Sequence, residues 1–210
     1  LAAMPKPGKV KATKVRKAIG VTEWTLSNGI KVILKPTDFK NDEILFSASS
    51  PGGSSLASDD NYLSADMCTQ IMQMGGVANF DMTALQKYLA GKRVSVAPTI
   101  SSLQEGFSGS SAPKDLETAF QLIYAYSTAP RKDSSAFGSI VARMKTFLEN
   151  KNLSPESAFQ DTFSVTMANY HYRARPYSTE LLKEVNLDKA YAFYVDRFSD
   201  MNDFTFYFVG

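Results

Sequence analysis

The order in which the apolar periodicity changes along the chain constrains the fold most. Residues 23–35 alternate apolar and polar side chains on both sides of Asn28-Gly29. This pattern predicts a β-hairpin with a tight type I′ turn, in which Asn28 and Gly29 both have positive φ angles. A third strand is predicted at 44–49, and the Pro- and Gly-containing segment 51–55 is expected to be a loop.

The period then becomes helical. One apolar stripe recurs at spacings of four and three within residues 61–74. The stripe consists of Leu63, Met67, Ile71 and Met74. The pair Gly75-Gly76 is expected to end this helix. A short helix is predicted at 83–90, with Asp81 as its N-cap, and two strands follow near 93–100 and 106–111.

The remainder of the chain is predicted to be helical until a final strand. Helices are expected around 116–124, 137–148 and 155–163, and shorter ones at 179–184 and 187–197. The alternating aromatic segment 203–209 predicts the last strand. With the short segment 179–184 not counted separately, the predicted order is βββ-αα-ββ-αααα-β. Runs of strands followed by runs of helices indicate an α+β fold, with a largely antiparallel sheet and helices packed on one face.

The first twenty residues differ from the rest in charge. They carry six Lys and Arg side chains and no acidic one, and Pro5, Pro7 and Gly8 interrupt regular structure. We interpret residues 1–20 as a solvated basic linker and residues 21–210 as a single domain; a basic arm that binds anions is the alternative. The net charge of the whole chain is only +2, so no nucleic-acid partner is expected.

The chain offers few residues for metal or covalent chemistry. It has one cysteine, Cys68, which lies in an apolar helical pattern and is expected to be a buried, inert thiol. It has one histidine, His171, which is expected in a surface loop, so a self-contained His/Cys zinc site is not expected. Neither a Gly-x-Ser-x-Gly elbow nor a phosphate-binding loop is present. We therefore assign no catalytic residue and no metal ligand to this chain.

A cluster of Tyr and Arg side chains follows the helical region. They could stack on bases or bind peptide carboxylates, although Arg and Tyr are also common in ordinary loops. The cluster consists of Tyr170, Tyr172, Arg173, Arg175 and Tyr177. Substrate-binding residues stay unassigned. No apolar run approaches the ~20 residues that span a membrane, so no membrane insertion is expected. The chain begins with Leu1, and we expect it to be part of a longer polypeptide.

Several segments together resemble a known family. They are the hairpin 25–35, the strand and loop leading to 50–54, the helix ending at 75–76, the segment 147–155 and the ending 191–210. In order and spacing they are similar to one whole repeat of the insulinase (pitrilysin-type) zinc metallopeptidases, over about residues 23–210. No single motif is diagnostic. The resemblance implies the clam-shell type of fold, in which two halves close around a peptide.

The resemblance also implies that this repeat is degenerate. The active repeat of the family carries H-x-x-E-H, in which two histidines bind zinc and the glutamate acts as base. Alignment on the glycine pair places Asp66, Thr69 and Gln70 at those three positions. Glu149 falls near the distal glutamate ligand of the family and is expected to be a solvated helix residue. The likeness is best to the non-catalytic C-terminal repeat of a bacterial zinc protease, so zinc is expected in the partner repeat and not in this chain.

Two functions follow as hypotheses. The first is the non-catalytic half of a zinc endopeptidase, which closes the chamber and helps to hold an extended peptide substrate for a separate zinc-bearing repeat. The second is a free-standing structural or protein-binding subunit of the same fold without peptidase activity. An H-x-x-E-H repeat encoded in frame before Leu1 would favour the first, and a start codon there the second. A bacterial periplasmic or envelope location is suggested by the resemblance alone.

Overall fold

The computed structural model describes residue 5 and residues 8–151 and 153–210. Lys6 and Pro7, which belong to the predicted linker, lie outside the described residues. The strands within the described part are β1 Val10–Arg16, β2 Val21–Leu26, β3 Lys31–Lys35, β4 Ile44–Pro51, β5 Val94–Ile100, β6 Gln104–Ser111 and β7 Thr205–Val209. The α-helices are α1 Tyr62–Gly75, α2 Met82–Leu89, α3 Leu116–Thr128, α4 Ser134–Lys151, α5 Pro155–Met167 and α6 Leu187–Phe198.

One sheet contains all seven of these strands, in the order β1-β2-β3-β7-β4-β6-β5. The strands β3 and β7 pair in parallel, and every other neighbouring pair is antiparallel. The last strand of the chain is thus inserted between β3 and β4. The predicted α+β fold with a largely antiparallel sheet is confirmed, as is the predicted order of elements from Val21 onward.

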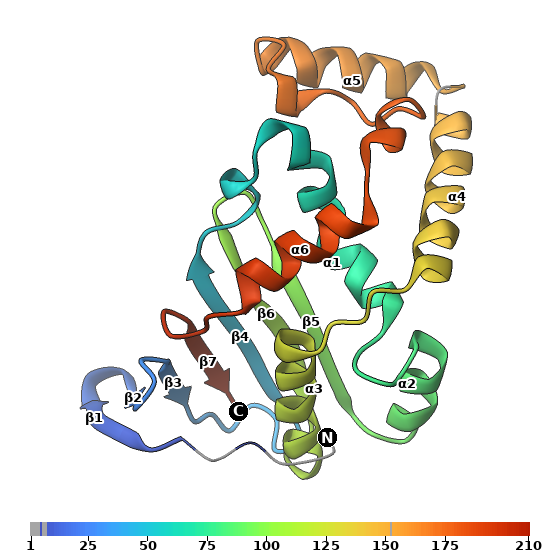
Figure 1. Cartoon of the computed structure of the whole chain (residues 1–210). Helices are drawn as coiled ribbons and strands as arrows, with labels where there is room; N and C mark the ends of the chain where they lie inside the picture. Colours follow the sequence, from blue (N-terminus) through green and yellow to red (C-terminus); the bar gives the residue numbers. More distant parts are fainter. Residues whose placement is uncertain (1–4, 6–7, 152) are drawn as a thin grey trace.

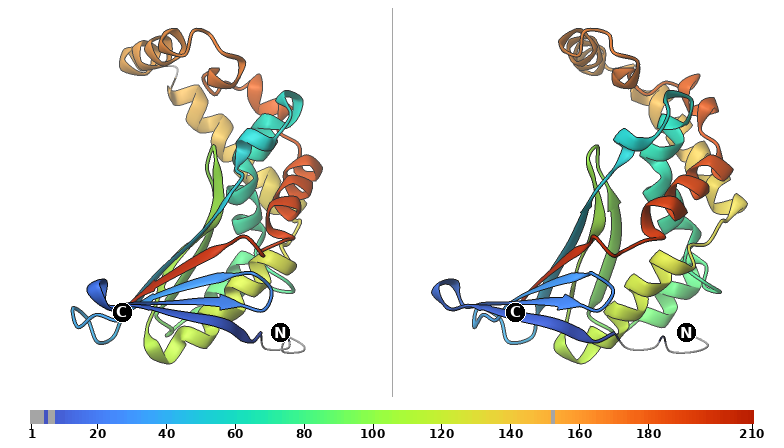
Figure 2. Two further views of the ribbon diagram at one scale, coloured as in Figure 1. Left: turned by 90° about the vertical axis from the view of Figure 1, so that its left-hand side faces the viewer. Right: turned by 60° about the vertical axis from the view of Figure 1, so that its left-hand side comes forward.

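The helices are distributed unevenly around the sheet. Helices α1, α3 and α6 lie along one face of it (Figures 1 and 2). Helices α4 and α5 extend beyond the end of the sheet at which β5 turns into β6 (Figure 1). The opposite face of the sheet is not covered by α1, α3 or α6 (Figure 2). The prediction of helices packed on one face is therefore confirmed.

The core lies between the sheet and these three helices. Leu63, Met67 and Ile71 of the predicted α1 stripe are buried in it. Phe107 on β6 is 1% exposed, and its ring centroid lies 4.9 Å from that of Phe198 at the end of α6. Aromatic rings at this spacing add to the stabilisation that their buried area provides. Aromatic rings thus join β6 to the end of α6.

The turn of the first hairpin differs from the prediction. Three residues, 27–29, connect Leu26 to Ile30, whose carbonyl oxygen accepts from the Leu26 N–H at 2.8 Å. Gly29 has a φ of 96°, whereas Asn28 does not have a positive φ. The predicted type I′ turn is therefore wrong. A loop with one more residue reverses the chain with a single residue, the glycine, in the left-handed region.

The strand β1 was not predicted. Residues 10–16 were expected within a linker, but they pair antiparallel with β2, and all seven side chains are exposed. An edge strand that packs neither face leaves no apolar alternation in the sequence, which explains why it was missed. Lysines are common on edge strands because they oppose pairing with another chain. Whether residues 1–20 connect this domain to another stays a prediction.

The predicted helix starts are confirmed by their hydrogen bonds. The Asp81 carboxylate accepts from the Ala84 N–H at 2.7 Å and caps α2. The Ser154 hydroxyl accepts from the Ser157 N–H at 3.3 Å, with Pro155 as the first residue of α5. Each bond satisfies a donor that the first turn of a helix would leave free. Among the described residues, no helix is long and apolar enough to cross a membrane.

Candidate functional site

The outward face of α1 carries the three residues that align with the zinc-binding motif. Asp66 and Gln70 are exposed and Thr69 is half-buried, whereas the apolar stripe of the same helix points into the core. Gln73 lies one further turn along, and its side-chain amide donates to the Pro98 carbonyl oxygen of β5 at 3.1 Å. Side chains four residues apart lie on one helix face. The helix thus presents a face with the spacing of the motif over the β5 side of the sheet.

Asp66 is bonded within the chain. The Tyr177 hydroxyl donates a hydrogen bond to its carboxylate. Burial, and then this hydrogen bond, raise the pKa of Tyr177 well above its usual range, so the phenol keeps its proton. The position that aligns with the first zinc-binding histidine is therefore engaged by a neutral donor from the segment before α6.

The remaining candidate ligands are dispersed. His171 is exposed in a loop, as predicted, and its Nδ1 accepts from the Arg173 N–H at 3.2 Å. Cys68 is buried, and burial raises the pKa of its thiol to about 12, which keeps it protonated and unreactive. Glu149 lies on α4, exposed and 3.9 Å from the Lys145 ammonium group. Across the described residues, no group of three or more His, Cys, Asp and Glu side chains could hold a metal ion.

The Tyr and Arg cluster forms contacts within the domain. The Arg173 guanidinium lies 4.8 Å from the centroid of the Tyr62 ring, and its Nε donates to Asp59 at 2.8 Å. The Arg175 guanidinium lies 3.8 Å from the Tyr172 ring centroid and pairs with Glu184 at 3.2 Å. Both guanidinium groups would have to leave these partners to bind a ligand. Arg173 thus fastens this segment to the start of α1, whereas Arg175 joins two parts of segment 172–184 to each other.

A buried carboxylate, which the sequence did not indicate, holds the loop between β4 and α1. Glu105 on β6 is 5% exposed and accepts a hydrogen bond from the Gly53 N–H. Arg197 of α6 lies 3.8 Å from the same carboxylate. Burial raises the pKa of Glu105, and the Gly53 N–H and the Arg197 charge oppose that rise. A side chain at Gly52 would collide with the Glu105 oxygens, so the loop fits closely around the carboxylate.

The uncovered face of the sheet is a surface on which a ligand in extended conformation could lie. Cross-strand partners place Ile33, Tyr207, Ser47 and Ser108 in one row across β3, β7, β4 and β6. Tyr207 is 43% exposed, whereas its neighbours Phe206 and Phe204 are buried on the helix side. The alternation of Phe46, Ser47 and Ala48 in β4 is the sequence signal that could have identified this face.

The uncovered face carries hydroxyl side chains and the exposed Leu45 over β4 and β6, and it is basic over β1–β3. Hydroxyl side chains at alternating positions of β4 share it, since Ser47 and Ser49 face away from the buried Phe46 and Ala48. Glu23 on β2 is paired with Arg16 at 2.7 Å. The hydrogen bond to Arg16 and the charges of Lys14 and Lys31 lower the pKa of Glu23. The surface can offer hydrogen bonds and positive charge to a ligand.

Known proteins resemble this chain over nearly its whole length. No protein-family model matches it. The Arabidopsis thaliana protein named "Zinc protease PQQL-like" is 28% identical over 207 residues, which cover 98% of this chain and 19% of that protein. The Haemophilus influenzae protein named "Probable zinc protease PqqL" is 23% identical over 90% of this chain and 20% of its own length. This chain therefore spans about a fifth of the curated relatives that it matches.

Solved structures show the same fold. The periplasmic protease PqqL from Escherichia coli superimposes with a TM-score of 0.80 at 20% identity, over 97% of this chain and 22% of its own. The ferredoxin protease FusC, solved in complex with Arabidopsis ferredoxin, gives 0.82 at 19% identity, over 99% and 23%. A peptidase M16 inactive domain from Pseudomonas fluorescens gives 0.71 at 16% identity, over 91% and 46%. The predicted resemblance is thereby confirmed: the curated relatives are named zinc proteases, and a peptidase M16 inactive domain has the same fold.

The outward face of α1 leads to a prediction about zinc. Because Asp66 is the only anionic group among the three aligned positions, the purified chain should hold no stoichiometric zinc. Elemental analysis after dialysis against micromolar zinc measures this. About one tightly bound zinc per chain, lost in Asp66→Asn, would contradict the prediction.

The buried carboxylate leads to a prediction about stability. Glu105→Ala removes the acceptor of the Gly53 N–H and leaves Arg197 without its buried partner, which should lower the free energy of unfolding by about 1–3 kcal/mol. Glu149→Ala, which removes an exposed carboxylate, should change it by no more than about 0.5 kcal/mol. Urea unfolding of both variants measures the difference, and equal midpoints would show that Glu105 does not hold the loop.

Proposed function

We propose that this chain is a repeat of the non-catalytic half of a zinc endopeptidase. It helps to close the chamber and to hold an extended peptide substrate, while a separate zinc-bearing repeat cleaves that peptide. At about a fifth of the length of the relatives, the chain supplies one repeat of that half and not the whole of it.

One observation carries this proposal. The likeness to proteins named zinc proteases extends over 98% of the chain, yet α1 presents Asp66, Thr69 and Gln70 where the peptidase motif has two histidines and a glutamate. An amide is a poor zinc ligand, and threonine is not a base that could deprotonate water near neutral pH. A repeat with this helix contributes shape and surface to a peptidase, and the metal-bound water must come from elsewhere.

The uncovered sheet face supports a role in holding a peptide. Proteolysis needs the scissile bond held within about 1 Å of its productive position, and a misplacement of that size can cost roughly 10²-fold in rate. The hydroxyl groups of Ser47 and Ser49 beside Tyr207 can form hydrogen bonds that orient an extended substrate. Closing such a wall over the substrate also excludes water, which strengthens electrostatic interactions within the chamber.

The partner implied by this proposal is a zinc-bearing peptidase repeat, on the same polypeptide or on another chain. Zinc bound there would polarise the attacking water, and no residue of this chain is required to touch the metal. The Escherichia coli neighbour is described as periplasmic. A periplasmic or envelope location is a proposal for this chain on that ground.

A second candidate function is supported by α5. Phe159 is 70% exposed, Phe163 50% and Met167 71%, and these three side chains recur every four residues along one helix face. No side chain of α5 is buried. An apolar stripe of this kind could dock against a protein partner. A structural subunit that binds another protein through α5, without any peptidase activity, is therefore the alternative.

The activity of the two parts together tests the proposal. The chain alone should not cleave a quenched fluorescent peptide. Adding it in excess to the zinc-bearing part of the protein, expressed without it, should raise turnover by at least about 10²-fold, because the substrate becomes oriented and desolvated. Equal rates with and without the chain would remove the role in catalysis and favour the structural subunit.

Two tyrosines of similar exposure test the role of the sheet face. Tyr207 on the uncovered face is 43% exposed, and Tyr124 on α3 is 40% exposed. In the complete peptidase, Tyr207→Ala should lower kcat/KM by about 3- to 30-fold, which corresponds to roughly 0.7–2 kcal/mol of lost substrate binding. Tyr124→Ala should leave it unchanged. Equal effects of the two substitutions would show that the uncovered face does not contact the substrate.

A further inference from the structure

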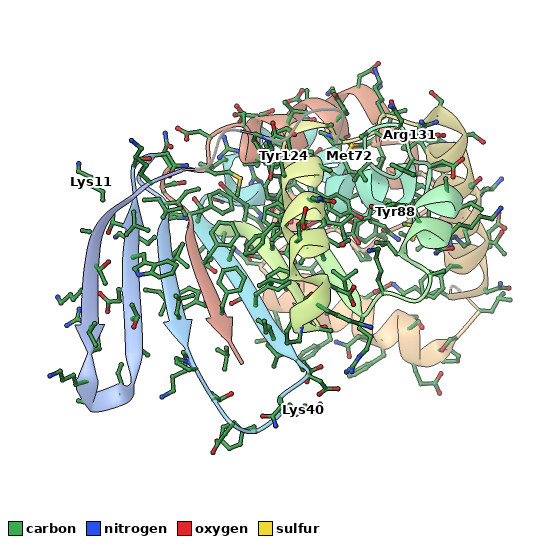
Figure 3. All side chains as sticks on the ribbon, turned by 90° about the horizontal axis from the view of Figure 1, so that it is seen from below. Lys11, Lys40, Met72, Tyr88, Tyr124 and Arg131 are labelled. Atoms are coloured by element: carbon green, nitrogen blue, oxygen red, sulfur yellow. The ribbon has the colours of Figure 1, made fainter. Side chains whose placement is uncertain are left out.

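An apolar groove lies on the helix side of the sheet, between α3 and the hairpin β2–β3. It has a volume of about 840 Å³ and is lined on the sheet side by Trp24, Leu26, Val32 and Leu34. Phe120 of α3 forms the opposite wall. Viewed from below, β1, β2 and β3 extend beyond α3, so that no described helix lies over these strands (Figure 3).

The lining of this groove has the character of a core and not of a solvated surface. Phe120 is 48% exposed, and Trp24, Val32 and Leu34 are each half-buried. Elsewhere on this face of the sheet, where α1 and α6 cover it, the apolar side chains are almost completely buried. A concave groove of several hundred Å³ that is lined mainly by apolar side chains is typical of a binding site.

The dimensions fit one helix. The five residues of β3 span roughly 16 Å, which is the length of about three turns of α-helix. A helix laid along β2 and β3 would continue the layer that α3 begins, because an α-helix with its side chains is about 10–12 Å wide. The polar groups at the rim, Lys35, Lys40 and Glu43, would lie beside its solvent-facing side.

We infer that this groove binds an amphipathic α-helix of the same polypeptide, from outside residues 1–210. The curated relatives are about five times as long as this chain, so in a protein of that length most of the polypeptide lies outside these residues. Gly210 itself lines the groove, and a helix connected to it would need only a short link to enter. The inference does not depend on the proposed function, since the apolar surface requires a cover whether or not the domain assists proteolysis.

Photo-crosslinking in the full-length polypeptide tests the inference. The photoreactive residue p-benzoyl-phenylalanine replaces Trp24, which faces the groove, or Ile33, which faces the uncovered side of the sheet. Irradiation should link position 24 to a single segment outside residues 1–210, with apolar residues at helical spacing. Position 33 should not link to that segment. Mass spectrometry of a mixture of isotopically heavy and light protein shows whether the link lies within one molecule.

Matched variants show whether the groove itself is responsible. Leu26→Asp places a charge in the groove and should abolish the crosslink from position 24, whereas Thr25→Asp places it on the uncovered face and should preserve the crosslink. If Leu26→Asp does not fold, the crosslink in the otherwise unaltered protein decides. A link to a second copy, a link to a different protein, a bound apolar small molecule in place of any segment, or no link from position 24 would each overturn the inference.

Discussion

The insertion of the last strand between β3 and β4 is the interaction on which the rest of the structure depends. Its backbone pairs with β3 over residues 205–209 and with β4 over the same residues, so it joins the amino-terminal hairpin to the central strands. Phe204 and Phe206 enter the core beside Phe198 and Phe107. Because this strand comes about 170 residues after β3 in the chain, the sheet is complete only when the last residues are in place. Strand β7 therefore connects the hairpin to the strands on which the helices pack.

Much of the fold could be predicted because its signals are local. The α1 stripe, the Asp81 cap and the Ser154-Pro155 helix start each lie within a few residues of the element that they define. Strand β1 could not be predicted in the same way, since its partner is β2 and its own side chains are all exposed. The turn at Gly29 was wrongly assigned for a related reason: the number of loop residues depends on the register between β2 and β3, which the Asn-Gly pair alone does not determine.

The candidate site was predictable only in what its helix face contains. The sequence placed Asp66, Thr69 and Gln70 on one face of α1, and the structure shows that face pointing away from the core. Tyr177, the partner of Asp66, lies 111 residues further along the chain, and Glu105 and Gly53 are 52 residues apart. Neither contact leaves a periodic trace in the sequence. In both contacts, a polar side chain bonds to a group that the packing of distant segments would otherwise leave without a partner. Such pairs can be identified only once the folded structure is known.

The two faces of the sheet explain why a peptide and a helix would bind on opposite sides. In β3, Val32 and Leu34 point to the groove while Ile33 points to the uncovered face, and in β4 the buried Phe46 and Ala48 alternate with Ser47 and Ser49. Covering an apolar face with a helix that has an apolar stripe lowers the free energy, because it removes apolar surface from water. Covering a face with hydroxyl groups in this way stabilises the structure little, because the hydroxyl groups would lose their hydrogen bonds to water. Such a face can instead form hydrogen bonds with a polar, extended chain that leaves part of the surface in contact with water. The pleat therefore separates an apolar side, which a helix could cover, from a side with hydroxyl groups, which could bond to an extended chain.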